Sequence, residues 1–104
     1  MVAVPETLSR LFASSLRIKI LHCLLSHPGQ SFHIAHVASL LDDYSATVSR
    51  ELANLAKAGL LTSFNIGNQK HYTLDLESPI LEDLRRIFSK TMGVPPSYDV
   101  AGQG

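Results

Sequence analysis

Apolar residues at helical spacing predict a first helix that begins near Pro5, a residue suited to a first helical turn. Its apolar stripe consists of Leu8, Leu11 and Phe12. A second helix follows, for which either Ser14 or Ser15 can supply the N-terminal cap. Its apolar residues are Leu16, Ile18, Ile20, Leu21, Cys23, Leu24 and Leu25. Because little polar surface remains, we expect this helix at the centre of the fold, with Pro28-Gly29 ending it.

The next pair of helices is predicted on either side of a tight turn. After a short extended segment at 30–32, a third helix has its apolar residues at helical spacing, namely Ile34, Val37, Ala38 and Leu41. The turn Asp42-Asp43-Tyr44-Ser45 separates it from a fourth helix over 45–58. The buried side of that helix would carry Val48, Leu52 and Leu55. Gly59 stands where a helix C-terminal glycine belongs.

The period of the pattern changes after Gly59 and becomes that of strands. The runs 60–66 and 70–76 are separated by Gly67-Asn68-Gln69, which predicts a β-hairpin. Alternate residues share a face of each strand: Leu60, Thr62, Phe64 and Ile66 in the first, and Tyr72, Leu74 and Leu76 in the second. Ser78-Pro79 is predicted to cap and start a last helix. Its broad apolar stripe consists of Ile80, Leu81, Leu84, Ile87 and Phe88.

The order of these elements predicts a mainly α fold with a small β-hairpin, arranged α-α-(β)-α-α-β-β-α. Two short helices joined by a tight turn and followed by a hairpin make the winged form of the helix-turn-helix. We expect one winged-helix domain over residues 1–92. The pattern fails after Gly93, so residues 93–104 are predicted to be a flexible C-terminal tail.

Composition bounds the class of protein. The chain has 104 residues, of which 45% are hydrophobic and 17% are charged, as expected for one folded domain. Nine basic residues balance nine acidic ones, so net charge gives no general argument for binding nucleic acid. One cysteine, no apolar run near the roughly 18–20 residues that span a bilayer, and no signal-peptide pattern indicate a cytoplasmic protein with no membrane association.

The solvent side of the fourth helix carries groups suited to DNA. Arg50 can donate two hydrogen bonds to guanine, and Asn54 can recognise adenine. Thr47 and Ser49 lie near the positive end of the helix, where a phosphate would bind, and Lys57 would add a phosphate contact. The predicted DNA-contacting residues of this helix are Ser45, Ala46, Thr47, Ser49, Arg50, Asn54 and Lys57.

The hairpin tip is polar and rich in hydrogen-bond donors, as a wing on the phosphate backbone would be. The predicted backbone contacts are Asn68, Gln69, Lys70 and His71. A solvated helix face and an ordinary exposed turn would each explain one of these features. Their occurrence together, in this order, favours DNA binding.

Several segments of the chain resemble the ArsR-like winged-helix family, over about residues 6–92. The segments are 11–25, Phe32-His33-Ile34, the stretch TVSREL…LAKAGLL over 47–61, and His71-Tyr72-Thr73-Leu74. Residues 78–93 look like the closing helix of a subgroup in which the winged helix stands alone or precedes a small nucleotidyltransferase domain. The resemblance implies a homodimer that places a recognition helix in the major groove and a wing along the backbone of each half-site. On that basis Thr47, Ser49 and Arg50 are recognition-helix residues, and Lys70 and His71 are wing residues.

The same resemblance implies that the dimer pairs through the first and last helices. The last helix has a stripe wide enough to leave part of it for a partner subunit. The expected interface residues are Leu8, Leu11, Phe12, Leu81, Leu84, Ile87 and Phe88.

The sequence departs from the family pattern at the turn and in the wing. Either Tyr44 fills an apolar position and Ser45 caps the recognition helix, which we favour, or Asp43 is the cap. Lys70 is the charged residue of a wing that usually carries several arginines, so we expect salt-sensitive binding.

No cofactor or metal is expected. The cysteine pairs and the acidic and histidine clusters of metal-sensing members are missing from the sequence. His33 and His36 alone do not complete a zinc site, and Cys23 in an apolar helix is expected to be a core residue.

Two functions follow. The first is a dimeric DNA-binding repressor that uses the helix 45–58 and the wing 60–76. The alternative is a winged-helix module for protein–protein interaction, which the neutral net charge, the acidic turn and the weakly basic wing favour. We find no arrangement of residues that supports an enzyme. A small-molecule effector is compatible with either, in a pocket between the first, second and last helices.

Overall fold

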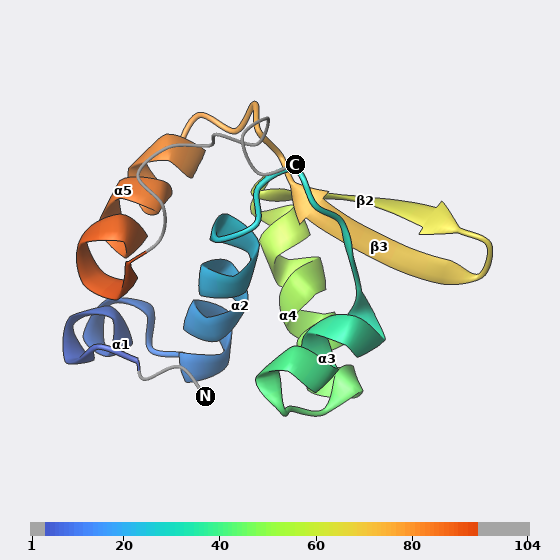
Figure 1. The fold of residues 1–104 in the computed structure, drawn as a ribbon, viewed down its shortest axis with the longest axis horizontal. Helices are drawn as coiled ribbons and strands as arrows, with labels where there is room; N and C mark the ends of the chain where they lie inside the picture. Colours follow the sequence, from blue (N-terminus) through green and yellow to red (C-terminus); the bar gives the residue numbers. More distant parts are fainter. Residues whose placement is uncertain (1–3, 94–104) are drawn as a thin grey trace.

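A computed structural model describes residues 4–93, so the predicted tail after Gly93 lies outside the described residues. Its elements follow the predicted order and form a winged helix (Figure 1). They are α1 (Glu6–Phe12), α2 (Ser15–Leu25), β1 (Phe32–His33), α3 (Ile34–Leu41), α4 (Ser45–Lys57), β2 (Leu61–Ile66), β3 (Gln69–Leu74) and α5 (Leu81–Met92). Within residues 4–93, no helix is long and apolar enough to cross a membrane.

Helix α2 lies at the centre, as its pattern predicts. Ser14 caps it, because its hydroxyl oxygen accepts a hydrogen bond from the backbone N–H of Arg17 at 3.1 Å. The buried residues of α2 are Ile18, Ile20, Leu21, Leu24 and Leu25, and they belong to one core with residues from every other helix and from the sheet. In Figure 1, α1 and α5 lie on one side of α2 and α4, and the β2–β3 hairpin extends away on the other.

The start of α4 differs from both predicted capping schemes. Tyr44 occupies the N-cap position in an extended conformation, and neither Ser45 nor Asp43 caps the helix with its side chain. Ser45 is already the first helical residue, and the Asp43 carboxylate instead accepts from the N–H of Tyr44 at 2.8 Å. Tyr44 is 82% exposed, so it does not fill an apolar position. The left-handed conformation of Asp42 turns the chain after α3.

Gly59 ends α4 as predicted. With a φ of 85°, it occupies the left-handed region that favours glycine. Its N–H bonds to Ala56 O, and the N–H of Leu60 bonds to Leu55 O. This pair of bonds satisfies two of the last helical carbonyls and turns the chain directly into β2.

The sheet has the order β1-β3-β2 and is antiparallel throughout. Ile66 pairs with Gln69, so the hairpin loop is Gly67-Asn68, and Gln69 belongs to β3 rather than to the loop. The strands also begin or end at other residues than predicted: β2 begins at Leu61, and β3 ends at Leu74.

The pairing register separates the two faces of the hairpin. Leu61 lies opposite Leu74 and Ser63 opposite Tyr72, which gives the face that packs on the core. Phe64 lies opposite His71 on the other face. Of the run predicted to share a face, Thr62, Phe64 and Ile66 therefore point away from the core, and Phe64 and Ile66 are 42% and 55% exposed, whereas Leu60 precedes β2 and is buried.

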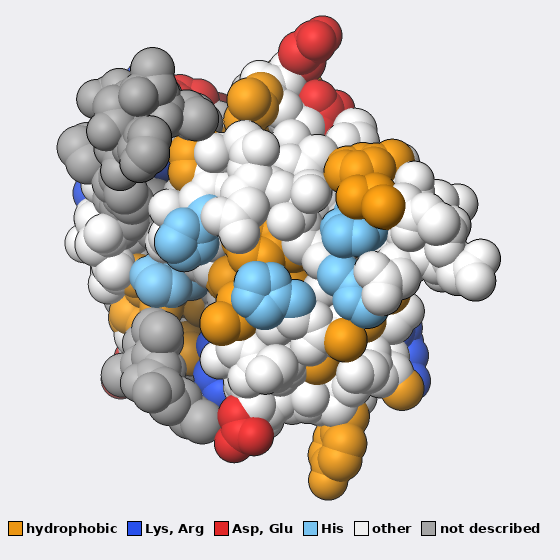
Figure 2. All heavy atoms as spheres, turned by 45° about the vertical axis from the view of Figure 1, so that its right-hand side comes forward, with side chains coloured by type: hydrophobic (Ala, Val, Ile, Leu, Met, Phe, Trp, Pro, Cys, Tyr) orange, Lys and Arg blue, Asp and Glu red, His pale blue; other side chains and the backbone are white. Residues whose placement is uncertain are grey.

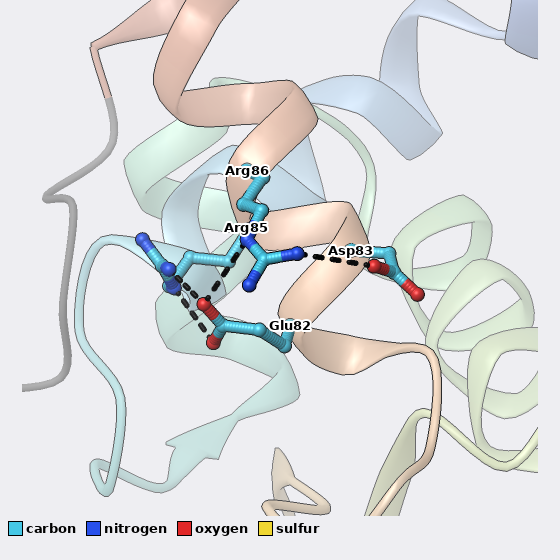
Figure 3. A network of polar contacts seen from close by, with 4 residues as sticks. All are labelled: Glu82, Asp83, Arg85 and Arg86. Carbon is cyan, nitrogen blue, oxygen red and sulfur yellow. Dashed lines mark hydrogen bonds and ion pairs between the residues drawn. The ribbon is translucent and has the colours of Figure 1, made fainter.

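Helix α5 begins at Leu81, not at Ser78-Pro79, because residues 78–81 close a separate turn in which the N–H of Leu81 bonds to Ser78 O. Sequence analysis also gave no sign that Arg85 is buried, with 7% exposure. Its guanidinium pairs with Glu82, and the neighbouring Arg86 lies 3.7 Å from both Glu82 and Asp83 (Figure 3). Glu82 thus compensates the charge that α5 buries.

Candidate nucleic-acid interface

The N-terminal half of α4 presents most of the predicted helical contacts to solvent. Ser45, Ala46 and Arg50 are exposed, and Thr47 and Ser49 are half-buried. Lys57 is exposed at the other end of the helix. Val48, Leu52 and Leu55 are buried, as predicted, and fix this orientation. The structure therefore brings Arg50 and the small polar residues of the first turns onto one accessible surface.

The absence of a side-chain cap changes what the start of α4 can bind. The first backbone N–H groups of a helix have no partner inside it. Since no side chain caps them here, those of Ser45, Ala46 and Thr47 can donate to an anion at the positive end of the helix dipole. Tyr44, 82% exposed at the N-cap, is a further candidate contact, and it does not fill the apolar position that was one of its predicted roles.

An ion pair holds α4 against α2. Arg17 Nε donates to Glu51 Oε1 at 2.5 Å, and Arg17 Nη2 lies 3.5 Å from Glu51 Oε2. The Glu51 side chain is 14% exposed, so most of its charge is compensated inside the protein rather than by solvent. The hydrogen bond to Glu51 raises the pKa of Arg17, with a smaller contribution from their charge attraction. The pair joins residues 34 positions apart, so no local pattern in the sequence predicts it.

Asn54 is exposed on α4, four positions after Arg50. It lines a cavity between α1, α2, α4 and the start of α5, together with Arg17 and Phe12. Its exposed amide is therefore on the flank of α4 that meets the other helices. A contact of Asn54 with DNA stays a prediction.

The wing contains the predicted residues in two environments. Asn68, Gln69 and Lys70 are exposed at its tip, and the Lys70 ammonium lies 5.7 Å from the centre of the Tyr72 ring. His71 lies in a different environment from the tip residues. Both of its ring nitrogens are buried and have no hydrogen-bond partner among the described residues, so this conformation cannot offer them to a phosphate.

His71 packs within a group of rings on the outer face of the sheet. Its ring centre lies 5.7 Å from that of Phe64 and 5.4 Å from that of His33, which pairs with it across β1 and β3. His36 lies elsewhere, against Phe32. Figure 2 shows histidine and apolar side chains interspersed on one face of the molecule. Over residues 4–93, no three histidine, cysteine, aspartate or glutamate side chains come together in a way that would hold a metal ion.

The predicted dimer residues divide into buried and accessible ones. Leu8, Leu81 and Phe88 are buried in the subunit's own core, so they support α1 and α5 rather than offer a surface. Leu11 and Ile87 are 68% and 38% exposed. Phe12 and Leu84 are half-buried, and both line the cavity. Ile80, which was not among the predicted interface residues, is also accessible at 48%.

Cys23 packs against the core, as expected for a small apolar residue. Burial raises the pKa of its thiol, so the thiolate is disfavoured near neutral pH. The free cysteine therefore lies in an environment opposite to that of a reactive one.

Solved structures of regulators have the same fold. HlyU from Vibrio cholerae is 23% identical with a TM-score of 0.62, over 80% of this chain and 85% of that chain. The transcriptional regulator HlyU from Vibrio vulnificus is 24% identical with a TM-score of 0.61, over 80% and 81%. AntR, an antimony-specific transcriptional repressor, is 22% identical with a TM-score of 0.60, over 78% and 69%.

The sequence itself matches no protein-family model and no curated protein. The likeness to the solved structures is therefore one of fold. The fold of this chain is the winged helix that these regulators share.

Proposed function

We propose that this chain is a sequence-specific, double-stranded-DNA-binding transcription regulator. The observation that carries the proposal is the start of α4, where uncapped backbone N–H groups and the exposed Arg50 lie together on a surface of small residues. A helix of this kind enters the major groove with its N-terminal residues toward the bases. The regulator functions of the Vibrio vulnificus protein and of AntR are consistent with the same use.

The groups on α4 divide into positioning and reading contacts. The backbone N–H groups of its first turn, with Tyr44 and Ser45, bind phosphate and set the depth of the helix. Ala46 is small enough to let the helix backbone approach the groove. Arg50 then donates two hydrogen bonds to a guanine and supplies the base discrimination.

The wing adds contacts along the backbone. Lys70 is the cation at its tip, and Asn68 and Gln69 add hydrogen-bond donors. These contacts neutralise few phosphates, which agrees with the net charge of zero. Affinity then depends on the two subunits of a dimer that bind neighbouring half-sites.

A homodimer that occludes an operator, and so represses, fits the accessible apolar residues of α1 and α5. Leu11, Ile80 and Ile87 project beyond the core on those elements. A surface of this kind gains stability when a second copy covers it. AntR is itself a repressor.

The test is a selection of genomic DNA fragments with the purified protein at low and moderate salt. An enriched palindrome with half-sites about one helical turn apart, near 10 base pairs, is the expected result. Arg50→Glu should abolish its recognition, whereas Lys90→Glu, the same charge reversal on α5, should retain it. If Arg50→Glu binds the palindrome as the native protein does, the assignment of the reading face is wrong.

The alternative is a protein-interaction module, and the outer face of the wing favours it. Phe64 and Ile66 are accessible there, and the strand that carries them has no charged residue. A partner protein could therefore cover this apolar surface. Absence of enrichment at both salt concentrations, with the protein folded, would support this alternative over the regulator.

A further inference from the structure

A cavity of about 310 Å³ opens between α1, α2, α4 and the start of α5. Its walls are mainly apolar and are contributed by Phe12, Leu21, Leu55, Leu60, Ile80 and Leu84. Arg17 and Asn54 are its polar lining residues. Cavities of roughly 300–1,000 Å³ with apolar walls and a few polar groups are the usual form of small-molecule sites.

Arg17 determines which polar group such a molecule would carry. Glu51 accepts from its Nε and from one of its terminal nitrogens. A guanidinium has five N–H donors, so part of the fork remains available. Within residues 4–93, no other acceptor is bonded to the Arg17 guanidinium, and its side chain is 37% exposed. Its partial exposure and planar donors suit a ligand carboxylate.

We propose that this cavity binds a small monocarboxylic acid with an apolar body. The apolar walls take the hydrocarbon part, and Arg17 and Asn54 hold the carboxylate at the polar edge. The site and the candidate nucleic-acid interface share helix α4, because Glu51, Asn54 and Leu55 all belong to it. The ligand is therefore an effector, a conclusion that rests on the proposed DNA-binding function.

Competition for Arg17 provides the coupling. A ligand carboxylate on the available donors shares Arg17 with Glu51 and weakens the charge compensation of Glu51, which is costly at an exposure of 14%. Glu51 escapes that cost when α4 moves away from α2. The bound ligand thus favours a position of α4 that differs from its position in the ligand-free protein, and it lowers the affinity for DNA. By linkage, DNA lowers the affinity for the ligand by the same factor.

The test uses octanoate and 1-octanol, which share an apolar chain and differ in the carboxylate. Binding to the full chain without DNA is measured by calorimetry and by backbone amide shifts. We expect octanoate to bind on the order of tenfold more tightly than octanol, with shifts at Leu60, Ile80 and Leu84. Equal affinity for the two would overturn the ligand class, and no binding of either would overturn the site.

Variants separate this site from weak binding elsewhere. Ala58→Trp fills the cavity mouth from an exposed position and should abolish octanoate binding, whereas Ala35→Trp, the same exposed substitution on α3, should not. Glu51→Gln frees Arg17 and should tighten octanoate binding several-fold without changing that of octanol. Arg17→Gln should remove the preference for the acid. Unchanged octanoate affinity in Ala58→Trp would overturn the cavity as the binding site. If Ala58→Trp shifts the monomer–dimer equilibrium and the native protein binds no octanoate, the cavity has another role.

The regulatory part is tested separately, by DNA affinity with and without octanoate. The coupling is supported if octanoate lowers the DNA affinity of the native protein but not that of Ala58→Trp. Octanoate binding with unchanged DNA affinity overturns the coupling alone. Octanoate binding by a protein that binds no DNA under any condition retains the site and overturns the proposed function.

Discussion

Arg17 of α2 and Glu51 of α4 form a two-point ion pair, with an Nε–Oε1 distance of 2.5 Å. Helix α4 also carries Arg50. Arg17 also lines the cavity, and Glu51 directly follows Arg50 on α4. The pair joins α2 to α4, so changes to either residue should alter stability and DNA binding together.

The pair should contribute measurably to stability. Arg17→Met leaves Glu51 mostly buried without a cation, and we expect a loss of about 1–2 kcal/mol, between the values for exposed and for buried pairs. Urea denaturation checks this value. The double variant Arg17→Met/Glu51→Gln should recover part of the loss, because it removes the uncompensated charge. Equal losses in the single and double variants would contradict the expected compensation.

Lys70 should contribute to DNA affinity without discriminating between sequences. Lys70→Ala should reduce the slope of log affinity against log salt by about 0.9 per subunit, the value for one phosphate contact. The effect should be equal on operator and on random DNA. Arg50→Ala serves as the contrast, since it should reduce the preference for operator by roughly 1–3 kcal/mol. A selective effect of Lys70→Ala on operator would assign it a reading role.

The ion pair between Glu82 and the buried Arg85 should make the protein less stable as the pH falls into the acid range. The hydrogen bond from Arg85 lowers the pKa of Glu82 from its usual 4.5, and charge attraction to Arg85 and Arg86 adds to this against a desolvation contribution that raises it. Because the folded pKa is depressed, the stabilisation is complete above about pH 4.5 and is lost as pH falls through the folded pKa.

The matching variant is Glu82→Gln. It should lower the Tm at pH 7, and the difference from the native protein should shrink as the pH falls below 4.5. Asp83→Asn is the control, because Asp83 is 70% exposed and contacts Arg86 at 3.7 Å. A Tm difference for Glu82→Gln that is constant with pH would refute this role of Glu82.

Gly59 should be required for its backbone conformation rather than for space. A Cβ added there meets no atom within 4 Å, yet φ is +85°. Gly59→Ala should therefore cost about 1–2 kcal/mol through the left-handed conformation alone. Gly59→Asn should cost less, since asparagine tolerates that region better. Thermal unfolding of both variants decides, and equal costs would indicate a different cause.

Local patterns predicted the elements well. The nearly all-apolar α2 lies at the centre, and the glycine after α4 forms the expected motif, because both depend on neighbours a few positions away. The predicted start of the helix at Ser45 is confirmed, but the predicted side-chain cap is wrong for a related reason. Ser45 has the chemistry of a cap, but the extended conformation falls on Tyr44, and the turn conformation at Asp42 decides that register.

The less predictable parts of the site depend on contacts between distant residues. Arg17 meets Glu51 only after two helices pack, and His71 is enclosed because β1 brings His33 beside it. Asn54 shares the helical period of Arg50 and also lines the cavity, since residues of α1 and α2 approach it there. No periodicity within one element contains this information.

Strand β2 has a consequence for handling the protein. It is an outer strand of the sheet, its six residues carry no charge, and Phe64 and Ile66 are accessible. An uncharged outer strand is a template for pairing with another chain. Concentrated samples should therefore self-associate through their hairpins, and DNA along the wing should suppress this by covering the strand.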